Sequence, residues 1–211
     1  MDCESVGGDE AEAVVRKAGM NDERVVQLIQ AFFSSLSEGV ALLVADPGVV
    51  AARTSLGETA LHYLCVENQV EAVRELMRRG AAVDTVNEVG STPLSDACSL
   101  GYLDLVQTLL EAGASLWLEG QHDPTLHQAV RGANVEIVKL ILDAGASVNE
   151  QADLSETALH IAVEDDHLEI AELLLSRRAD PDLKRIFDET ALDVAERHAS
   201  TRCMALLSTK H

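Results

Sequence analysis

The chain has 211 residues, of which 47% are apolar and only 3% are aromatic, and its formal net charge is −20 at neutral pH. A charge of this sign repels nucleic acid and anionic membranes, so partners of both kinds are disfavoured. No apolar run approaches the roughly 18 residues that span a bilayer, and the N-terminus lacks the basic and apolar regions of a secretory signal. We therefore expect a cytoplasmic protein.

The four cysteines show no spacing that is typical of a metal site or a redox pair. Cys65 and Cys98 lie 33 residues apart, each on an apolar helix face. A small buried hydrophobic side chain is the simplest interpretation of both. We expect neither a metal nor a cofactor.

The chain before residue 57 predicts helices but no clear repeat motif. Residues 1–20 are acidic and contain glycine, so we expect a partly disordered segment with a short helix over 11–18. Apolar side chains at helical spacing then predict an amphipathic helix from residue 21, and a second helix is expected over 37–45. We interpret residues 21–56 as a degenerate repeat that closes one end of a stack.

From residue 57 onward the chain repeats itself with a period near 33 residues. Equivalent leucines are separated by 33, 32, 33 and 33 residues, namely Leu61, Leu94, Leu126, Leu159 and Leu192. A period of this length is typical of stacked repeats that form one elongated domain. The predicted repeats cover residues 57–89, 90–121, 122–154 and 155–187, followed by a capping repeat over 188–211.

Each repeat predicts a short helix, a turn and a longer helix. The first helix begins at a threonine such as Thr59, whose hydroxyl can accept from unpaired backbone N–H groups. The longer helix is expected, for example, over 70–78 and 135–143. The turn between the helices needs a residue that tolerates positive φ, and we assign this role to Asn68, Gly101, Gly132 and Asp166.

Two departures from the repeat pattern affect local geometry. The third full repeat begins with Pro124-Thr125 where the second has Thr92-Pro93, so the start of its first helix should differ. The fourth has Arg178 where the others end the second helix with glycine. If the backbone keeps its conformation there, we expect a cost of up to about 1 kcal/mol.

The repeated motifs resemble those of the ankyrin-repeat family. They are GETALH at 57–62, GSTPL at 90–94, PTLH at 124–127, SETALH at 155–160 and LILDAGASVN at 140–149. The resemblance implies an all-α solenoid of helix–turn–helix units joined by hairpin-like loops. It also implies that the concave face and the hairpin tips bind other proteins, and that the domain is not catalytic.

Three histidines near the repeat starts, His62, His127 and His160, invite a metal-binding interpretation. Residues in successive repeats lie roughly 10 Å apart if the helices pack normally. That distance is too long for the histidines to share one zinc ion. We expect each histidine instead to form hydrogen bonds with its own threonine or with a hairpin backbone.

The carboxylates do not predict an enzyme. General acid–base catalysis needs two carboxylates in a closed pocket with different environments, and the sequence shows neither a phosphate-binding loop nor a nucleophile elbow. We therefore expect no catalytic residue.

Acidic residues are unevenly distributed along the chain. Residues 140–176 contain nine acids and no lysine or arginine. We predict a negative strip that attracts a basic partner, formed by Glu58, Glu67, Glu88, Asp123, Asp153, Glu156, Glu164 and Asp165. The alternative is an acidic face that only confers solubility.

Two aromatic residues lie in predicted hairpins, namely Trp117 and Phe187. A projecting aromatic side chain is a typical interface anchor, so we predict that both contact a partner. The alternative for Trp117 is that its shortened loop folds it back onto the neighbouring repeat.

The sequence thus predicts a monomeric, non-catalytic module that binds a protein partner, and its charge favours a basic one. The alternative function is a stoichiometric inhibitor or immunity-type protein that blocks a basic enzyme, for example one that processes nucleic acid, with its acidic surface.

Overall fold

The structure of the chain is a computed structural model that describes residues 23–208. The acidic segment and short helix predicted over 1–20 lie outside the described residues. Within 23–208, α-helices alternate with loops, and the only β-structure consists of isolated bridges. The prediction of an all-α repeat fold is confirmed.

The helices follow one another in pairs, with short 3₁₀-helices in three loops. The pairs are α2 (Glu23–Ser34) and α3 (Leu36–Ala45), α4 (Ala60–Val66) and α5 (Val70–Arg78), α6 (Pro93–Ser99) and α7 (Leu103–Glu111), α8 (Thr125–Arg131) and α9 (Val135–Asp143), α10 (Ala158–Glu164) and α11 (Leu168–Ser176), and α12 (Ala191–Arg197) and α13 (Thr201–Ser208). The 3₁₀-helices are η1 (Pro47–Ala51), η2 (Asp153–Ser155) and η3 (Ile186–Asp188). The helices predicted over 37–45, 70–78 and 135–143 are therefore confirmed to within one residue.

Internal contacts divide the chain into two compact units. Among the described residues, unit 1 comprises 23–93 and 108–114, and unit 2 comprises 94–107 and 115–208. In unit 1, α2 packs on α4 and α3 packs on α5. The first helices of its repeats thus form one layer and the second helices form another.

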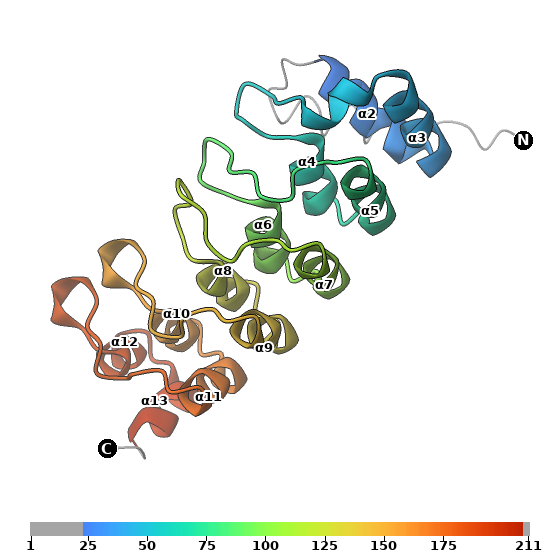
Figure 1. Ribbon diagram of the computed structural model, residues 1–211. Coiled ribbons are helices and arrows are strands. Elements are labelled where there is room, and N and C mark those ends of the chain that lie inside the picture. Colours follow the sequence, from blue (N-terminus) through green and yellow to red (C-terminus); the bar gives the residue numbers. More distant parts are fainter. Residues whose placement is uncertain (1–22, 209–211) are drawn as a thin grey trace, which may run out of the picture. The chain divides into compact units, whose positions relative to one another are not determined.

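Unit 2 has the same two layers. Helix α10 packs between α8 and α12, while α11 packs between α9 and α13. Figure 1 shows that the loops before α10 and α12 project beyond the layer of first helices, on the side away from α9 and α11. The buried core of each unit consists almost entirely of leucine, isoleucine, valine and alanine side chains, as their dominance in the sequence predicts.

The turns between paired helices confirm most of the predicted positive-φ residues. Asn68, Gly101 and Asp166 have φ values of 53°, 73° and 54°. The prediction for Gly132 is wrong, because Gly132 is right-handed (φ −69°) and Ala133 takes the positive φ of 54°. Gly132 is needed for a different reason, since a Cβ atom there would lie 2.1 Å from the carbonyl oxygen of Cys98.

The end of the fourth repeat keeps its left-handed residue despite lacking glycine. Arg178 has φ 69°, and its N–H donates to the carbonyl of Leu175 as a capping residue should. The Cβ atom of arginine disfavours this conformation. The predicted departure therefore leaves the fold intact at a cost in stability.

We expect Arg178→Gly to raise the free energy of unfolding by about 1 kcal/mol, because glycine adopts positive φ without a steric penalty. Urea denaturation monitored by circular dichroism measures this change. Arg178→Ala is the matched control, since it removes the same charge but keeps the Cβ atom that disfavours positive φ. The interpretation is wrong if Arg178→Gly is no more stable than Arg178→Ala.

Two of the first helices, α4 and α10, begin with a hydrogen-bonded threonine–histidine pair. In α10, the backbone N–H of Thr157 donates to Nδ1 of His160 (3.2 Å), and the equivalent bond joins Thr59 to His62 (3.2 Å). In α12, a carboxylate oxygen of Asp193 replaces the imidazole and accepts from the N–H of Thr190 (2.8 Å).

Helix α8 lacks this bond. Pro124 occupies the capping position and has no N–H, so Nδ1 of the buried His127 has no hydrogen-bond partner. Thr125, displaced into the helix, donates its hydroxyl to the carbonyl of Leu116 instead (2.7 Å). The inverted Pro-Thr pair thus leaves one buried acceptor unsatisfied.

We expect Pro124→Thr to stabilise the chain by about 1 kcal/mol, because the new N–H can donate to His127 Nδ1 while Thr125 keeps its own bond. Thermal unfolding compares the variant with the wild type. The gain should vanish when His127→Leu is introduced alongside, since the acceptor is then absent. A gain that persists in that background would contradict this explanation.

Candidate partner-binding site

Four hairpin loops end in tips of the same construction. The N–H of the first tip residue donates to the carbonyl of the fifth, at distances of 2.8 to 3.0 Å. We call these segments tip 1 (54–58), tip 2 (87–91), tip 3 (152–156) and tip 4 (185–189). Tips 1 and 2 belong to unit 1, and tips 3 and 4 belong to unit 2.

The third residue of each tip is a large apolar side chain exposed to solvent. The exposed fractions are 41% for Leu56, 60% for Val89, 64% for Leu154 and 81% for Phe187. A single exposed hydrophobic residue needs no explanation, but the same exposure at one position of four repeats does. The sequence predicts Phe187 as a contact residue and does not single out Leu56, Val89 or Leu154. Each of these residues lies three places before a repeat threonine, namely Thr59, Thr92, Thr157 or Thr190. This shared spacing was the signal available in the sequence.

The backbone of tips 3 and 4 differs from that of tips 1 and 2. In unit 1 the positive φ of the tip falls on Gly57 and Gly90, both at 72°. In unit 2 two consecutive residues are left-handed in each tip. They are Leu154 (61°) and Ser155 (58°), and Phe187 (68°) and Asp188 (65°).

This conformation is costly for bulky side chains. A left-handed residue other than glycine costs roughly 1–2 kcal/mol, and a bulky apolar one is a genuine outlier. Tips 1 and 2 show that glycine can close the same loop in this chain. The strain in tips 3 and 4 is therefore not required by the stacking of repeats, and residual strain of this kind is common at functional sites.

Trp117 lies beside its hairpin tip rather than on it. The turn of this shortened loop closes between Leu118 and Gln121, where the N–H of Gln121 donates to the carbonyl of Leu118 (3.1 Å). Trp117 precedes this turn and is 47% exposed. The equivalent residue one repeat later, Asn149, bonds to the following repeat through Arg178 O and Asp180 N. Trp117 is thus exposed, in a position that elsewhere contacts the next repeat.

Several residues of the predicted acidic strip lie in one network of ion pairs in unit 2. Arg131 contacts Asp123 (2.9 Å) and Glu156 (3.1 Å). Arg185, whose side chain is only 10% exposed, contacts Glu156 and Glu164 at 2.9 Å each. Arg185 also reaches Glu189 at 3.3 Å, and Arg197 contacts the same carboxylate at 3.0 Å. The arginines that neutralise these acids come from outside the 140–176 stretch, so sequence distance concealed the pairing.

The remaining acids of the predicted strip differ in their surroundings. Glu58 accepts a hydrogen bond from the hydroxyl of Tyr63. Of the eight acids in the predicted strip, all within 23–208, four have side chains that form neither an ion pair nor a hydrogen bond, namely Glu67, Glu88, Asp153 and Asp165. These four leave negative charge available to a partner.

Asp166 has a structural role that the sequence did not reveal. Its carboxylate accepts from Arg202 Nε and from the N–H of Cys203, both at 3.0 Å. These bonds hold the start of α13, and they lower the pKa of Asp166. Asp166 therefore anchors the last helix and is not a free part of the acidic surface.

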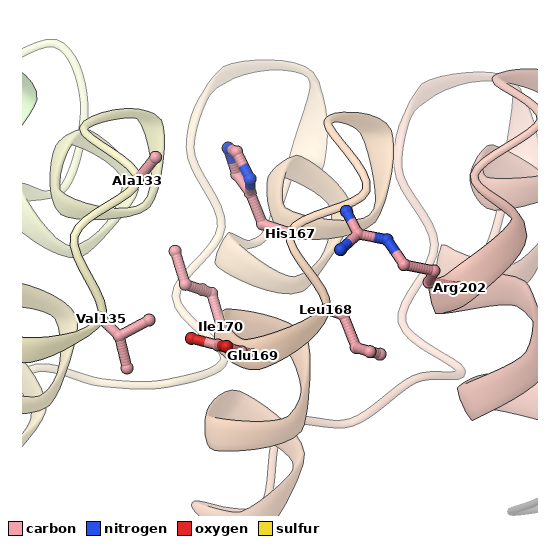
Figure 2. Close-up of a pocket in the computed structure, with 7 residues that line it drawn as sticks. All are labelled: Ala133, Val135, His167, Leu168, Glu169, Ile170 and Arg202. Atoms are coloured by element: carbon pink, nitrogen blue, oxygen red, sulfur yellow. The ribbon is translucent and has the colours of Figure 1, made fainter.

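Two surface pockets in unit 2 are lined partly by charged side chains that are already paired. Figure 2 shows one of about 150 Å³ in unit 2, where His167 and Arg202 lie above apolar side chains such as Ile170. Arg202 is already bound to Asp166. A second pocket, of about 230 Å³, is lined by Glu156, Glu164 and Asp165, and two of these carboxylates are engaged by Arg185.

The repeat histidines are buried and neutral. Burial lowers the pKa of both His62 and His127 to about 4, and it lowers the pKa of His160. Nε2 of His127 lies 3.1 Å from the carbonyl of Glu150, and Nε2 of His160 lies 3.3 Å from that of Glu189. The predicted hydrogen bonds to threonine are confirmed for His62 and His160. Over residues 23–208, no group of three or more His, Cys, Asp or Glu side chains could hold a metal ion.

A family model described as ankyrin repeats (3 copies) matches residues 26–119 and 123–211. The chain belongs to the ankyrin-repeat family. Its paired helices, buried repeat histidines and projecting hairpins are those of ankyrin repeats, which are generally non-catalytic protein-interaction modules. No helix within the described range is long and apolar enough to cross a membrane.

Relatives share the repeats over part of the chain. SMC5-SMC6 complex localization factor protein 1 of Homo sapiens is 39% identical over 95 residues, which cover 44% of this chain and 9% of that protein. Ankyrin repeat protein nuc-2 of Neurospora crassa is 31% identical over 111 residues, which cover 52% of this chain and 10% of that protein. Ankyrin repeat and KH domain-containing protein mask of Drosophila melanogaster is 39% identical over 93 residues, which cover 40% of this chain and 2% of that protein. The matched region thus spans a tenth or less of each relative.

We expect the free energy of unfolding to fall as the pH drops from 6.5 towards about 4. In this window the unfolded chain protonates histidines that the folded chain keeps neutral, because their folded pKa is lowered from 6.5 to about 4. Each such histidine contributes a loss of about 1.4 kcal/mol per pH unit. Urea denaturation at several pH values measures the slope, which His127→Gln should reduce. An unchanged slope in that variant would contradict the assignment.

Proposed function

We propose that this chain is a non-catalytic binding module that recognises a protein partner through the hairpin tips of each unit and the first helices that adjoin them within that unit. The observation that carries this proposal is the exposed apolar side chain at the same position of four tips, Leu56, Val89, Leu154 and Phe187. Soluble proteins gain nothing in their free state from apolar side chains at such projecting positions. Their burial against a partner would be favourable.

The absence of a catalytic role is supported by the surroundings of the titratable groups. The histidines with shifted pKa values point into the repeat core and are bonded to its backbone or to threonine. The paired carboxylates of unit 2 are bound to arginines rather than left free for proton transfer. Neither group has the accessible, mixed environment that acid–base chemistry needs.

Charge favours a basic partner. The chain has a net charge of −20, and Glu67, Glu88, Asp153 and Asp165 lie on tips or at the ends of first helices without internal pairing. Complementary charge accelerates association and suppresses wrong partners. One relative is named for the localization of a protein complex, which agrees with a protein-binding role for the shared repeats.

The alternative function, inhibition of a basic enzyme by an acidic surface, gains no specific support. Asp123, Glu156 and Glu164, which were assigned to that surface, are compensated by arginines within the chain. An inhibitor that imitates nucleic-acid phosphates would need these charges uncompensated.

We expect the intact chain to capture a protein from the lysate of its source cell, and a bait with lysine at the four unpaired acids to lose it. That bait carries Glu67→Lys, Glu88→Lys, Asp153→Lys and Asp165→Lys. Substitution at these positions breaks no internal ion pair, unlike substitution of Asp166. Quantitative mass spectrometry after washes at low and high salt compares the baits.

A second bait controls for the change in total charge. It carries Glu111→Lys, Glu136→Lys, Glu169→Lys and Glu172→Lys, which alter net charge equally but lie on second helices. Retention by this bait and loss by the first would locate recognition to the tips and first helices. Failure of the wild-type chain to capture any protein above background would contradict a binding function.

A further inference from the structure

We propose that tips 3 and 4 form a rigid pair of apolar projections, Leu154 and Phe187, that insert into an apolar pocket with a basic rim on a folded partner protein. The proposal rests on the protein-binding function above and specifies its contact residues and the kind of partner. It is carried by three observations in unit 2, namely the exposure of these side chains, the strain of their backbone and the bracing of the two tips.

The two tips are linked to each other at several points. The amide of Gln151 in the loop of tip 3 donates to Ser155 O (3.1 Å) and to Lys184 O (3.3 Å) beside tip 4. Arg185 of tip 4 forms an ion pair with Glu156 of tip 3. A side chain and a charge pair thus fix the position of one tip relative to the other.

Both tips are also fixed to the helices beneath them. Arg185 contacts Glu164 at the end of α10 (2.9 Å), and Nε2 of His160 in α10 lies 3.3 Å from Glu189 O, the carbonyl that closes tip 4. Projections held in this way lose little conformational freedom on binding, and such preorganisation raises affinity.

The strained backbone points to a function for the side chains that it presents. Asparagine or glycine at positions 154 and 187 would fit the left-handed conformation better than leucine and phenylalanine do. These two side chains are the most exposed of the large apolar residues in the described part of the chain, at 64% and 81%. Their presence lowers the stability of the free chain, so their use lies in a complex.

The shape and charge of the tips select the partner. A side chain on a projecting turn can be buried only by a concave surface, which favours a pocket on a folded protein over a flat face. A second copy of this chain is disfavoured, because each copy has a net charge of −20. The segments 146–157 and 179–190 contain seven acids and two bases, so the rim of the pocket should be basic.

A photo-crosslinking amino acid placed in the full chain tests the contact directly. One variant has benzoylphenylalanine at position 187, a second has it at position 165 on the first-helix layer, and a control has it at the exposed Val44 of α3. After irradiation in lysate of the source cell, we expect one protein to be linked from position 187 and not from position 44. Crosslinks from position 165 alone would overturn this proposal but leave the protein-binding function standing, and no crosslink from any position would overturn both.

The crosslinked protein, once purified, allows the affinity to be measured. Titration calorimetry should show that Leu154→Asn with Phe187→Asn weakens binding by at least about tenfold, whereas Val44→Asn leaves it unchanged. The tip variant should melt at a higher temperature than the wild type, because asparagine tolerates positive φ. Affinity should fall as salt increases. Unchanged affinity in the tip variant, or an acidic partner whose binding is independent of salt, would overturn the proposal.

Discussion

The two hydrogen bonds of the buried His160 are the interactions on which the position of tip 4 depends. In α10, Nδ1 of His160 accepts from the N–H of Thr157, and Nε2 faces Glu189 O of the next loop at 3.3 Å. The imidazole therefore connects the start of one helix to the tip that follows it. This arrangement requires a neutral imidazole with its proton on Nε2. Burial keeps the ring neutral by lowering the pKa of His160, and the bond from the Thr157 N–H to Nδ1 selects the tautomer. A metal-binding or catalytic role would need the same two nitrogen atoms, which are already used in these hydrogen bonds.

On this scaffold, unit 2 combines stability and strain in adjacent residues. Arg185 is almost buried among Glu156, Glu164 and Glu189, which stabilises its charge and fixes tip 4. Two residues later, Phe187 is left-handed and 81% exposed. The ion pairs need not add much to global stability to be useful, because buried pairs are often retained for geometry rather than for free energy. Here they hold an unfavourable side chain in one place.

Much of the fold could be predicted because the repeat imposes the same local physics several times. Apolar spacing, threonine caps and turn residues agreed on helices whose observed bounds differ by at most one residue in the cases specified. Gly132 was misassigned because a glycine can serve either positive φ or close packing, and only the approach of Cys98 O distinguishes the two. The missing hydrogen bond to Nδ1 of His127 follows from Pro124, which has no N–H. Only the structure shows that His127 is buried, so that the missing bond costs stability.

The candidate site was less predictable, since it depends on contacts between distant residues. Glu156 and Glu164 lie in a stretch of sequence without lysine or arginine, so no ion pair is predicted for them. In the structure, Arg131 and Arg185 reach them from outside that stretch. Leu154 was overlooked because a leucine in a loop has no distinctive pattern, and its exposure appears only in three dimensions. Positive φ at a leucine and a phenylalanine is likewise invisible in the sequence, where glycine or asparagine would be the expected signal.

The central claim is that the free chain already presents Leu154 and Phe187 on left-handed tips. Solution NMR of the isotope-labelled chain tests this most directly, through the three-bond coupling between the amide and α protons and the intraresidue distance between them. The account predicts positive φ at both residues without any partner. Negative φ at either residue in the free chain would contradict it, because the strain and the preorganised geometry would then be absent.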